Sequence, residues 1–199
     1  MVTNVLLTGV GGQGIITAST ILSQACRLAG WEVKKSEVHG MSQRGGSVNS
    51  YVRFSPDAPI ASPLIPEGAA DIMVAFEPLE ALRQIAEVAP EGTVLVEERR
   101  IVPVTVNLPG FDYPDDVLDR LQASERDVRV IGAYETAVGL GEPRAANSVI
   151  LGALSTLLDL PYEAWRKAMQ LVLKPKAIAV NIRAFEAGRE LAIARSAEA

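Results

Sequence analysis

The sequence predicts an α/β fold, and three observations support this prediction. Through the first two thirds of the chain, short apolar runs typical of strands buried on both faces alternate with stretches of helical spacing. A glycine-rich turn at residues 9–14 joins the first of these strands to the first helix, and from residue 145 onward the apolar spacing is helical only. We therefore expect a three-layer α/β/α Rossmann-like fold, with a mixed but mostly parallel sheet and a helical C-terminal third, and we interpret residues 1–199 as a single domain.

The chain opens with a strand, a helix and a second strand, which is the βαβ opening of a doubly wound sheet. Residues 4–8 are a short apolar run that predicts the first strand. Residues 15–29 place apolar side chains at helical spacing, and Gly30 is a typical C-terminal glycine. Residues 31–38 are expected to form the second strand.

The third strand is expected to make the sheet mixed. Residues 47–54 alternate in polarity, and residues 55–57 close them as a turn. No crossover helix precedes this strand, and short connections usually join antiparallel strands. Residues 60–66 contain prolines among apolar residues and are expected to be an ordered loop or an edge segment.

The middle of the chain supplies the remaining strands and two helices. We expect strands at 71–76, 92–97 and 128–131, an edge strand at 102–106, and helices at 79–88 and 115–122. Pro78 suits the first turn of the helix that it precedes, and Arg99 and Arg100 are expected in a solvated turn. The C-terminal third is expected to form helices at 145–158, 162–173 and 177–194.

Composition limits the class of protein. The 199 residues are 48% hydrophobic and 22% charged, which suffices for a sizeable core. The net charge of -5 gives no basic footprint, so nucleic acid is a poor candidate partner. No apolar run approaches the roughly 20 residues of a membrane helix, and the N-terminus lacks the basic and apolar regions of a signal peptide. We expect a cytoplasmic protein with no membrane partner.

The single cysteine, Cys26, excludes an internal disulfide. An iron–sulfur cluster usually needs four cysteine ligands, so any cluster must belong to another chain. Cys26 lies within the first helical pattern, where a small buried side chain is a far commoner role than that of a nucleophile. We assign it to packing.

The glycine-rich turn is the first candidate binding site. It fits the pattern G-x-G-x-x-G with Gly9, Gly11 and Gly14, and it also contains Gly12 and Gln13. Glycines accept positive φ and allow close approach, and the N–H groups at a helix N-terminus attract anions. Phosphate is the natural guest, but such turns also serve as tight packing corners, and the pattern alone does not separate the two interpretations.

A second glycine-rich stretch follows the second strand. A dinucleotide site needs an acidic residue at the end of that strand, and Glu37 qualifies. The residues that come next are too irregular and glycine-rich for an ordinary crossover helix, so the signal for a nicotinamide cofactor is incomplete.

The residues of this second stretch have alternative interpretations. His39, the only histidine, could be a general base, but without a placed nucleophile or carboxylate pair a role in orienting the loop is favoured. Arg44 either contacts a phosphate group or neutralises Glu37. Gly45 and Gly46 are expected to permit close approach of another chain.

Several motifs together resemble a known family. They are GVGGQG at residues 9–14, SEVHGMSQRGGSV at 36–48, Val52-Arg53, Ser62-Pro63, Ala70-Asp71, PRAAN at 143–147, LGAL at 151–154, and Asn181 with Ala184, Phe185 and Gly188. With these motifs the chain resembles the gamma-type domain of 2-oxoacid:ferredoxin oxidoreductases. Within that family it is most similar to the indolepyruvate type, whose beta subunit consists of this domain alone.

The resemblance implies one subunit of an enzyme that oxidatively decarboxylates a 2-oxoacid, indolepyruvate or another aryl pyruvate, to an acyl-CoA and passes the electrons to ferredoxin. Thiamine diphosphate, magnesium and iron–sulfur clusters are then expected on a larger catalytic subunit, because this chain has no Gly-Asp-Gly thiamine motif and only one cysteine. We expect this chain to have no catalytic residue, no tightly bound cofactor and no activity alone.

Coenzyme A is the candidate ligand of the glycine-rich turn on family grounds. Residues 36–47 are expected to contact the catalytic subunit close to its thiamine site, because their glycines allow close approach and their polar groups need partners. No metal ligand is expected. The candidate cofactor-binding residues are Gly9, Gly11, Gly12, Gln13, Gly14, Glu37, His39, Ser42, Arg44, Gly45, Gly46 and Ser47.

Two other functions fit part of the pattern. A stand-alone NAD(P)-dependent dehydrogenase would explain the glycine-rich turn and Glu37, but it needs a catalytic set that the sequence does not offer. A non-catalytic Rossmann-like interaction module would explain the lack of catalytic residues, and it differs from the subunit interpretation only in its partner.

Overall fold

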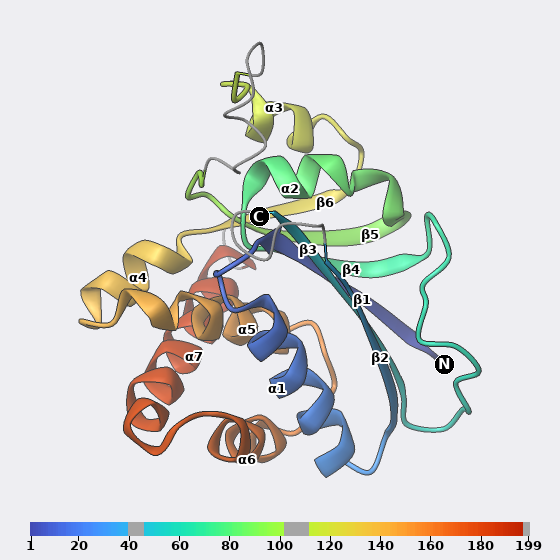
Figure 1. Cartoon of the computed structure of the whole chain (residues 1–199), viewed down its shortest axis with the longest axis vertical. Helices are drawn as coiled ribbons and strands as arrows, with labels where there is room; N and C mark the ends of the chain where they lie inside the picture. The colour runs from blue at the N-terminus through green and yellow to red at the C-terminus, as the bar shows by residue number, and fades with distance from the viewer. Residues whose placement is uncertain (40–45, 102–111, 197–199) are drawn as a thin grey trace.

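The computed structural model describes residues 1–39, 46–101 and 112–196 (Figure 1). The first two thirds contain all six strands together with α1, α2 and α3, and helices follow. In chain order they are β1 (Thr3–Val10), α1 (Ile15–Leu28), β2 (Glu32–His39), β3 (Ser47–Ser55), β4 (Ala70–Ala75), α2 (Pro78–Arg83), η1 (Ile85–Glu87), β5 (Val88–Glu97), α3 (Val117–Gln122), β6 (Asp127–Ile131), α4 (Ala133–Gly139), η3 (Pro143–Ala145), α5 (Ala146–Ser155), α6 (Tyr162–Val172) and α7 (Pro175–Ser196).

The strands form one six-stranded mixed sheet in the order β2-β3-β1-β4-β5-β6. β1, β4, β5 and β6 are parallel neighbours, whereas β3 runs antiparallel to both β1 and β2. The expectation of a mixed sheet with an antiparallel third strand is thus confirmed. The expected βαβ opening needs a correction, because β3 lies between β1 and β2. Its pairing with β1 runs from Thr3↔Phe54 to Val10↔Ser47, so β3 fills the position beside β1 that β2 was expected to take.

Helices cover the sheet in two layers (Figure 1). Val5 and Leu7 of β1 pack on one face into the core that α1, α4, α5, α6 and α7 cover. Leu6 and Met73 face the other side and pack beneath α2 and α3. The three-layer α/β/α expectation is confirmed. Cys26 is fully buried in the first core, as expected of a packing residue, and burial raises the pKa of its thiol to about 12.

The largest differences from the expected elements are at α2, where β5 begins at Val88 rather than at residue 92, and at α4. α2 ends at Arg83 rather than at residue 88, because Val88 already begins β5 and pairs with Ala70. α4 was not expected. It has seven residues, of which only Ala133 and Ala137 are buried, so it lacks a long apolar period. The strand expected at 102–106 lies outside the described residues. None of the described helices combines the length and the apolar character needed to span a membrane.

Candidate functional site

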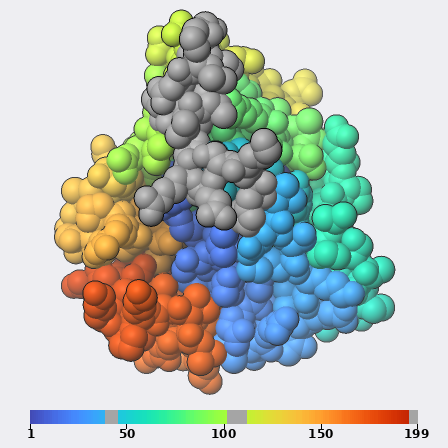
Figure 2. Space-filling view, viewed as in Figure 1, coloured from blue at the N-terminus to red at the C-terminus, as the bar shows by residue number. Residues whose placement is uncertain are grey.

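A cleft of about 470 Å³ lies at the carboxyl ends of β1, β4 and β5. Its lining comes from the glycine-rich turn, from Phe76 after β4, from Glu97 at the end of β5 with Arg99 and Ile101 after it, and from Tyr134 and the start of α5. In open α/β sheets, ligands bind outside the carboxyl ends of the strands. Figure 2 shows the N-terminal segment in dark blue reaching this face of the molecule between the orange C-terminal helices and β2 in lighter blue.

Gly12 and Gly14 of the glycine-rich turn line this cleft, and their backbone N–H groups have no partner in the described residues. Gly12 has φ 107° and Gly14 has φ 83°, conformations that favour glycine. Gly14 is the N-cap of α1, which has neither a side-chain cap nor an acidic residue in its first turn. Within the described parts of the chain, no hydrogen bond satisfies the N–H of Gly12 or Gly14. Since the helix dipole also points here, the turn has the chemistry of an anion site.

Two residues of the turn hold its shape. Gln13 Oε1 accepts a hydrogen bond from the Val10 N–H at 2.7 Å, and Gln13 Nε2 donates to the Phe76 carbonyl at 2.5 Å. The Gln13 amide therefore joins the turn to the end of β4. A Cβ on Gly9 would lie 2.8 Å from Gln13 Oε1 and 2.9 Å from Phe76 Cβ, so this position requires glycine for packing.

The end of the second glycine-rich stretch, Gly46 and Ser47, lies beside the first. The Gly11 N–H donates to the Gly46 carbonyl at 2.8 Å, and Ser47 pairs with Val10 across the β1–β3 ladder. His39 ends β2 opposite Val48. Of the remaining predicted site residues, Ser42, Arg44 and Gly45 lie outside the described residues.

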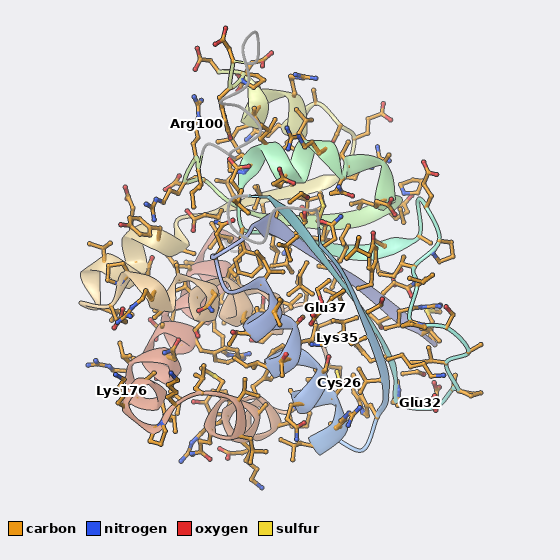
Figure 3. All side chains as sticks on the ribbon, viewed as in Figure 1. Cys26, Glu32, Lys35, Glu37, Arg100 and Lys176 are labelled. Carbon is orange, nitrogen blue, oxygen red and sulfur yellow. The ribbon has the colours of Figure 1, made fainter. Side chains whose placement is uncertain are left out.

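Glu37 does not occupy the position of a ribose-binding carboxylate. Its Oε1 lies 2.7 Å from Lys35 Nζ, and Lys35 Nζ also donates to Thr20 Oγ1 of α1 at 3.0 Å. Figure 3 shows Lys35 and Glu37 side by side between β2 and α1. Because β3 separates β2 from β1, Glu37 is one strand farther from the glycine-rich turn than in a dinucleotide fold. This geometry counts against the nicotinamide interpretation.

The opposite wall of the cleft was missed by sequence reasoning. The Arg99 guanidinium lies 3.6 Å from the centre of the Tyr134 ring in a cation–π contact, while Arg99 and Arg100 are both exposed after β5, as expected. The buried Glu97 carboxylate accepts the Arg99 N–H at 3.0 Å and the Tyr134 N–H at 2.8 Å. Burial raises the pKa of Glu97, while these two N–H groups oppose the rise. Glu97 and Tyr134 are 37 positions apart in the sequence, so no local sequence pattern predicts their contact.

Asn147 contributes from the first turn of α5. A Cβ on Gly14 would lie 2.5 Å from Asn147 Nδ2, so this amide sits directly against the turn. Its Oδ1 is buried and has no hydrogen-bond partner among the residues that the structure describes. Buried polar atoms are normally paired, so an unpaired one at a cleft is suited to a ligand or an ordered water. Arg144, one turn earlier, is largely exposed and binds Glu142 Oε1 at 2.9 Å.

The chain is similar to named proteins over nearly its whole length. It is 40% identical over 190 residues to the indolepyruvate oxidoreductase subunit IorB of Pyrococcus horikoshii, and the match covers 93% of each chain. It is 37% identical over 194 residues to the subunit of the same name from Archaeoglobus fulgidus, covering 96% of this chain and 95% of that one. It also matches 36% of the longer ketoisovalerate oxidoreductase subunit VorA of Methanothermobacter thermautotrophicus, at 29% identity.

Solved structures share the fold. The gamma subunit of a keto/oxoacid ferredoxin oxidoreductase from Geobacter sulfurreducens superposes with a TM-score of 0.73 at 26% identity, covering 96% of this chain and 99% of that one. A 2-oxoglutarate:ferredoxin oxidoreductase from Magnetococcus marinus gives 0.76 at 23% identity and shows the same fold within 31% of its chain. Residues 4–191 match the pyruvate ferredoxin/flavodoxin oxidoreductase family. The chain therefore belongs to the pyruvate ferredoxin/flavodoxin oxidoreductase family.

Proposed function

We propose that this chain is the small, non-catalytic subunit of a cytoplasmic, thiamine diphosphate-dependent indolepyruvate ferredoxin oxidoreductase. The assembled enzyme oxidatively decarboxylates an aryl 2-oxoacid to an acyl-CoA and passes the electrons to ferredoxin. The observation that supports this most directly is the 40% identity, over 93% of each chain, with a protein named as an indolepyruvate oxidoreductase subunit.

The cofactors of this reaction do not fit the residues of this chain. The one cysteine is fully buried, and its raised pKa disfavours the thiolate that ligates iron. The sequence has no Gly-Asp-Gly motif for thiamine diphosphate and magnesium. We therefore assign thiamine diphosphate, magnesium and the iron–sulfur clusters to a larger partner subunit.

The first test compares the isolated chain with the assembled enzyme. The purified chain is expected to contain no iron and to show no indolepyruvate oxidation with ferredoxin, because it lacks both cofactors. Adding the larger subunit is expected to give CoA-dependent turnover. Turnover by the chain alone would contradict the proposal, and a native partner without thiamine diphosphate or iron would favour the interaction-module alternative.

Coenzyme A is the ligand that we propose for the cleft. Its pyrophosphate suits the N–H groups of Gly12 and Gly14 at the start of α1, and the buried Asn147 Oδ1 offers an acceptor to a ligand hydroxyl or amide. Arg99 supplies a cation on the opposite wall. The role of this chain is then to bind and orient coenzyme A for the active site of the partner.

Replacing Gly12 by alanine tests the coenzyme A site. A Cβ on Gly12 meets no atom within 4 Å, so the methyl group would occupy the space that a phosphate needs. We expect the assembled enzyme to bind coenzyme A about tenfold or more weakly by calorimetry, because close approach to the N–H groups is lost. The matched control is Gly30→Ala at the far end of α1. Gly30 also has positive φ, 80°, and open space around its Cβ position.

Both variants are expected to lose about 1–2 kcal/mol of unfolding free energy, since both force a side chain into a left-handed conformation. Only Gly12→Ala should weaken coenzyme A binding. Equal affinities of the two variants would mean that the turn is a packing corner.

We also propose that residues 36–47 form the contact with the larger subunit, close to its thiamine site. Within the described part of this segment, Val38 is 51% exposed on the outer strand of the sheet, and Gly46 adjoins the glycine-rich turn. The described ends of the segment are thus an exposed apolar position on β2 and a residue beside the glycine-rich turn that lines the cleft, which suits an interface beside the coenzyme A site.

A further inference from the structure

Glu77 is a fully buried carboxylate beside the cleft. It follows Phe76, which lines the cleft, and it is the N-cap of α2. Its Oε2 accepts the Glu80 N–H at 2.9 Å. Its Oε1 accepts the Tyr113 hydroxyl at 2.6 Å and the Ile101 N–H at 3.4 Å. One carboxylate therefore joins the end of β4, the segment after β5 and the segment before α3.

Arg100 makes a second set of contacts between the segment after β5 and the segment before α3. The Arg100 guanidinium donates to Asp115 Oδ1 at 3.0 Å and to the Asp115 carbonyl at 2.7 Å, and it lies 5.4 Å from the centre of the Tyr113 ring. Figure 3 places Arg100 at this end of the molecule, near α3. Its neighbours Arg99 and Ile101 line the cleft, so the two contacts hold the backbone from which the cleft wall projects.

The fold alone gives little reason for a carboxylate here. A neutral Ser, Thr or Asn caps a helix as well as Glu, and burying a carboxylate is costly unless it is well paired. No cation binds Glu77 in the described residues. The neighbouring carboxylate, Glu80, is also buried, and its own cation is Arg83 at 2.6 Å. What the carboxylate adds is the acceptor capacity that binds Tyr113 and Ile101 at one oxygen while it caps α2 with the other.

We propose that Glu77, acting through Tyr113 and Ile101, is a positioning residue that holds the wall from Arg99 to Ile101 in the geometry that binds the ligand of the cleft. The identity of that ligand rests on the proposed function, whereas the positioning itself does not.

The ionised form of Glu77 is the one that makes this contact. Burial raises the pKa of Glu77, and the hydrogen bond from Tyr113 is the largest influence that lowers it. The charged groups around it are Glu80 and Arg83 on α2 and the Arg100–Asp115 pair. As the pH falls through the raised pKa, the carboxyl group gains an O–H and can no longer accept at both oxygens. The wall then loosens, and ligand affinity falls.

This loss is local. A carboxyl group whose pKa is raised on folding is protonated more readily in the folded state than in the unfolded state, so its protonation does not lower the free energy of unfolding. Removing the Tyr113 hydroxyl removes an interaction that favours the charged form, so the pKa rises further and the affinity is lost at a higher pH.

The test uses the full chain in complex with its larger subunit. Coenzyme A binding is measured across pH for the native protein, Tyr113→Phe and Glu77→Gln. The control, Tyr162→Phe, removes a Tyr–Glu hydrogen bond of 2.5 Å between α6 and α7, remote from the cleft. We expect Tyr113→Phe to weaken coenzyme A binding about threefold to tenfold at neutral pH and to raise the pH below which affinity is lost. Tyr162→Phe should change neither the affinity nor that pH. In Glu77→Gln, which has no carboxyl group to titrate, the affinity should no longer fall with pH in that range.

Hydrogen exchange of the free chain gives a readout that does not depend on the ligand. Tyr113→Phe is expected to speed amide exchange at residues 99–101 without changing exchange in α6 and α7. Unchanged exchange at 99–101, or a pH profile of Tyr113→Phe identical to the native one, would overturn the positioning role. If the native complex does not bind coenzyme A, the proposed ligand is wrong, and the exchange result still decides the role of Glu77.

Discussion

Replacing Gly188 by alanine is expected to unfold the protein or to lower its free energy of unfolding by about 3 kcal/mol or more. A Cβ at this position of α7 would lie 1.8 Å from the Val149 carbonyl oxygen and 3.0 Å from its Cα on α5. On the facing helix, a Cβ on Gly152 would lie 2.0 Å from the Phe185 carbonyl oxygen. These atoms are backbone, so the only relief is to separate two helices that cross at direct contact.

Denaturant unfolding of Gly188→Ala and Gly139→Ala measures this effect. Gly139 ends α4, and a Cβ there meets no atom within 4 Å. Alanine at 139 should be neutral or stabilising by up to about 1 kcal/mol, because alanine is the better helix former. Equal midpoints for the two variants would show that α5 and α7 can separate without cost.

The crossing of these helices also sets the cleft. Ser148 Oγ donates to Asn181 Oδ1 of α7 at 2.6 Å, and both side chains are buried. Asn147, the next residue toward the N-terminus of α5, lies against Gly14. The position of α7 therefore fixes how far α5 extends toward the glycine-rich turn, which ties the C-terminal motif with Asn181 and Gly188 to the binding site.

The predictable part of the fold is the part that local pattern determines. The apolar run of β1 and the helical period of α1 are encoded within each segment, and both elements appear within two residues of their expected bounds. The antiparallel direction of β3 followed from its short connection to β2. The two helices α5 and α7 were expected from spacing, but nothing local indicated that Gly152 and Gly188 bring their backbones into contact.

The unpredicted part depends on contacts between distant segments. Periodicity identifies a strand without naming its partner, so the insertion of β3 between β1 and β2 could not be foreseen. In the cleft wall, Glu97 and Arg99 contact Tyr134, and behind the wall Glu77 accepts the Tyr113 hydroxyl. These residues were hidden from a motif search, because glycine spacing marks a turn but not the side chains that the fold places opposite it.

The proposed interface makes a prediction for the exposed end of β2. Val38 is 51% exposed and faces the same side of the sheet as its ladder partner Asn49, on a strand with no further neighbour in the described sheet. Burying the Val38 side chain against the larger subunit would favour association, whereas a carboxylate at this position would lose its hydration when the subunits associate. We expect Val38→Asp to weaken association with the larger subunit about 30-fold or more, with a matching loss of turnover at limiting subunit concentration.

The control for Val38→Asp is Leu171→Asp on α6, where an exposed leucine, at 64%, lies far along the chain from residues 36–47. Arg44→Ala and His39→Ala extend the test to the polar part of the segment, and both are expected to reduce association and turnover while the isolated chain keeps a near-native melting temperature. If the variants melt at lower temperatures and associate less only to the extent that the isolated chain is less stable, then the segment stabilises the fold and is not an interface. Normal association and turnover in all three segment variants would refute the interface, because an interface that buries residues 36–47 cannot accept a carboxylate at Val38 without separating the two chains.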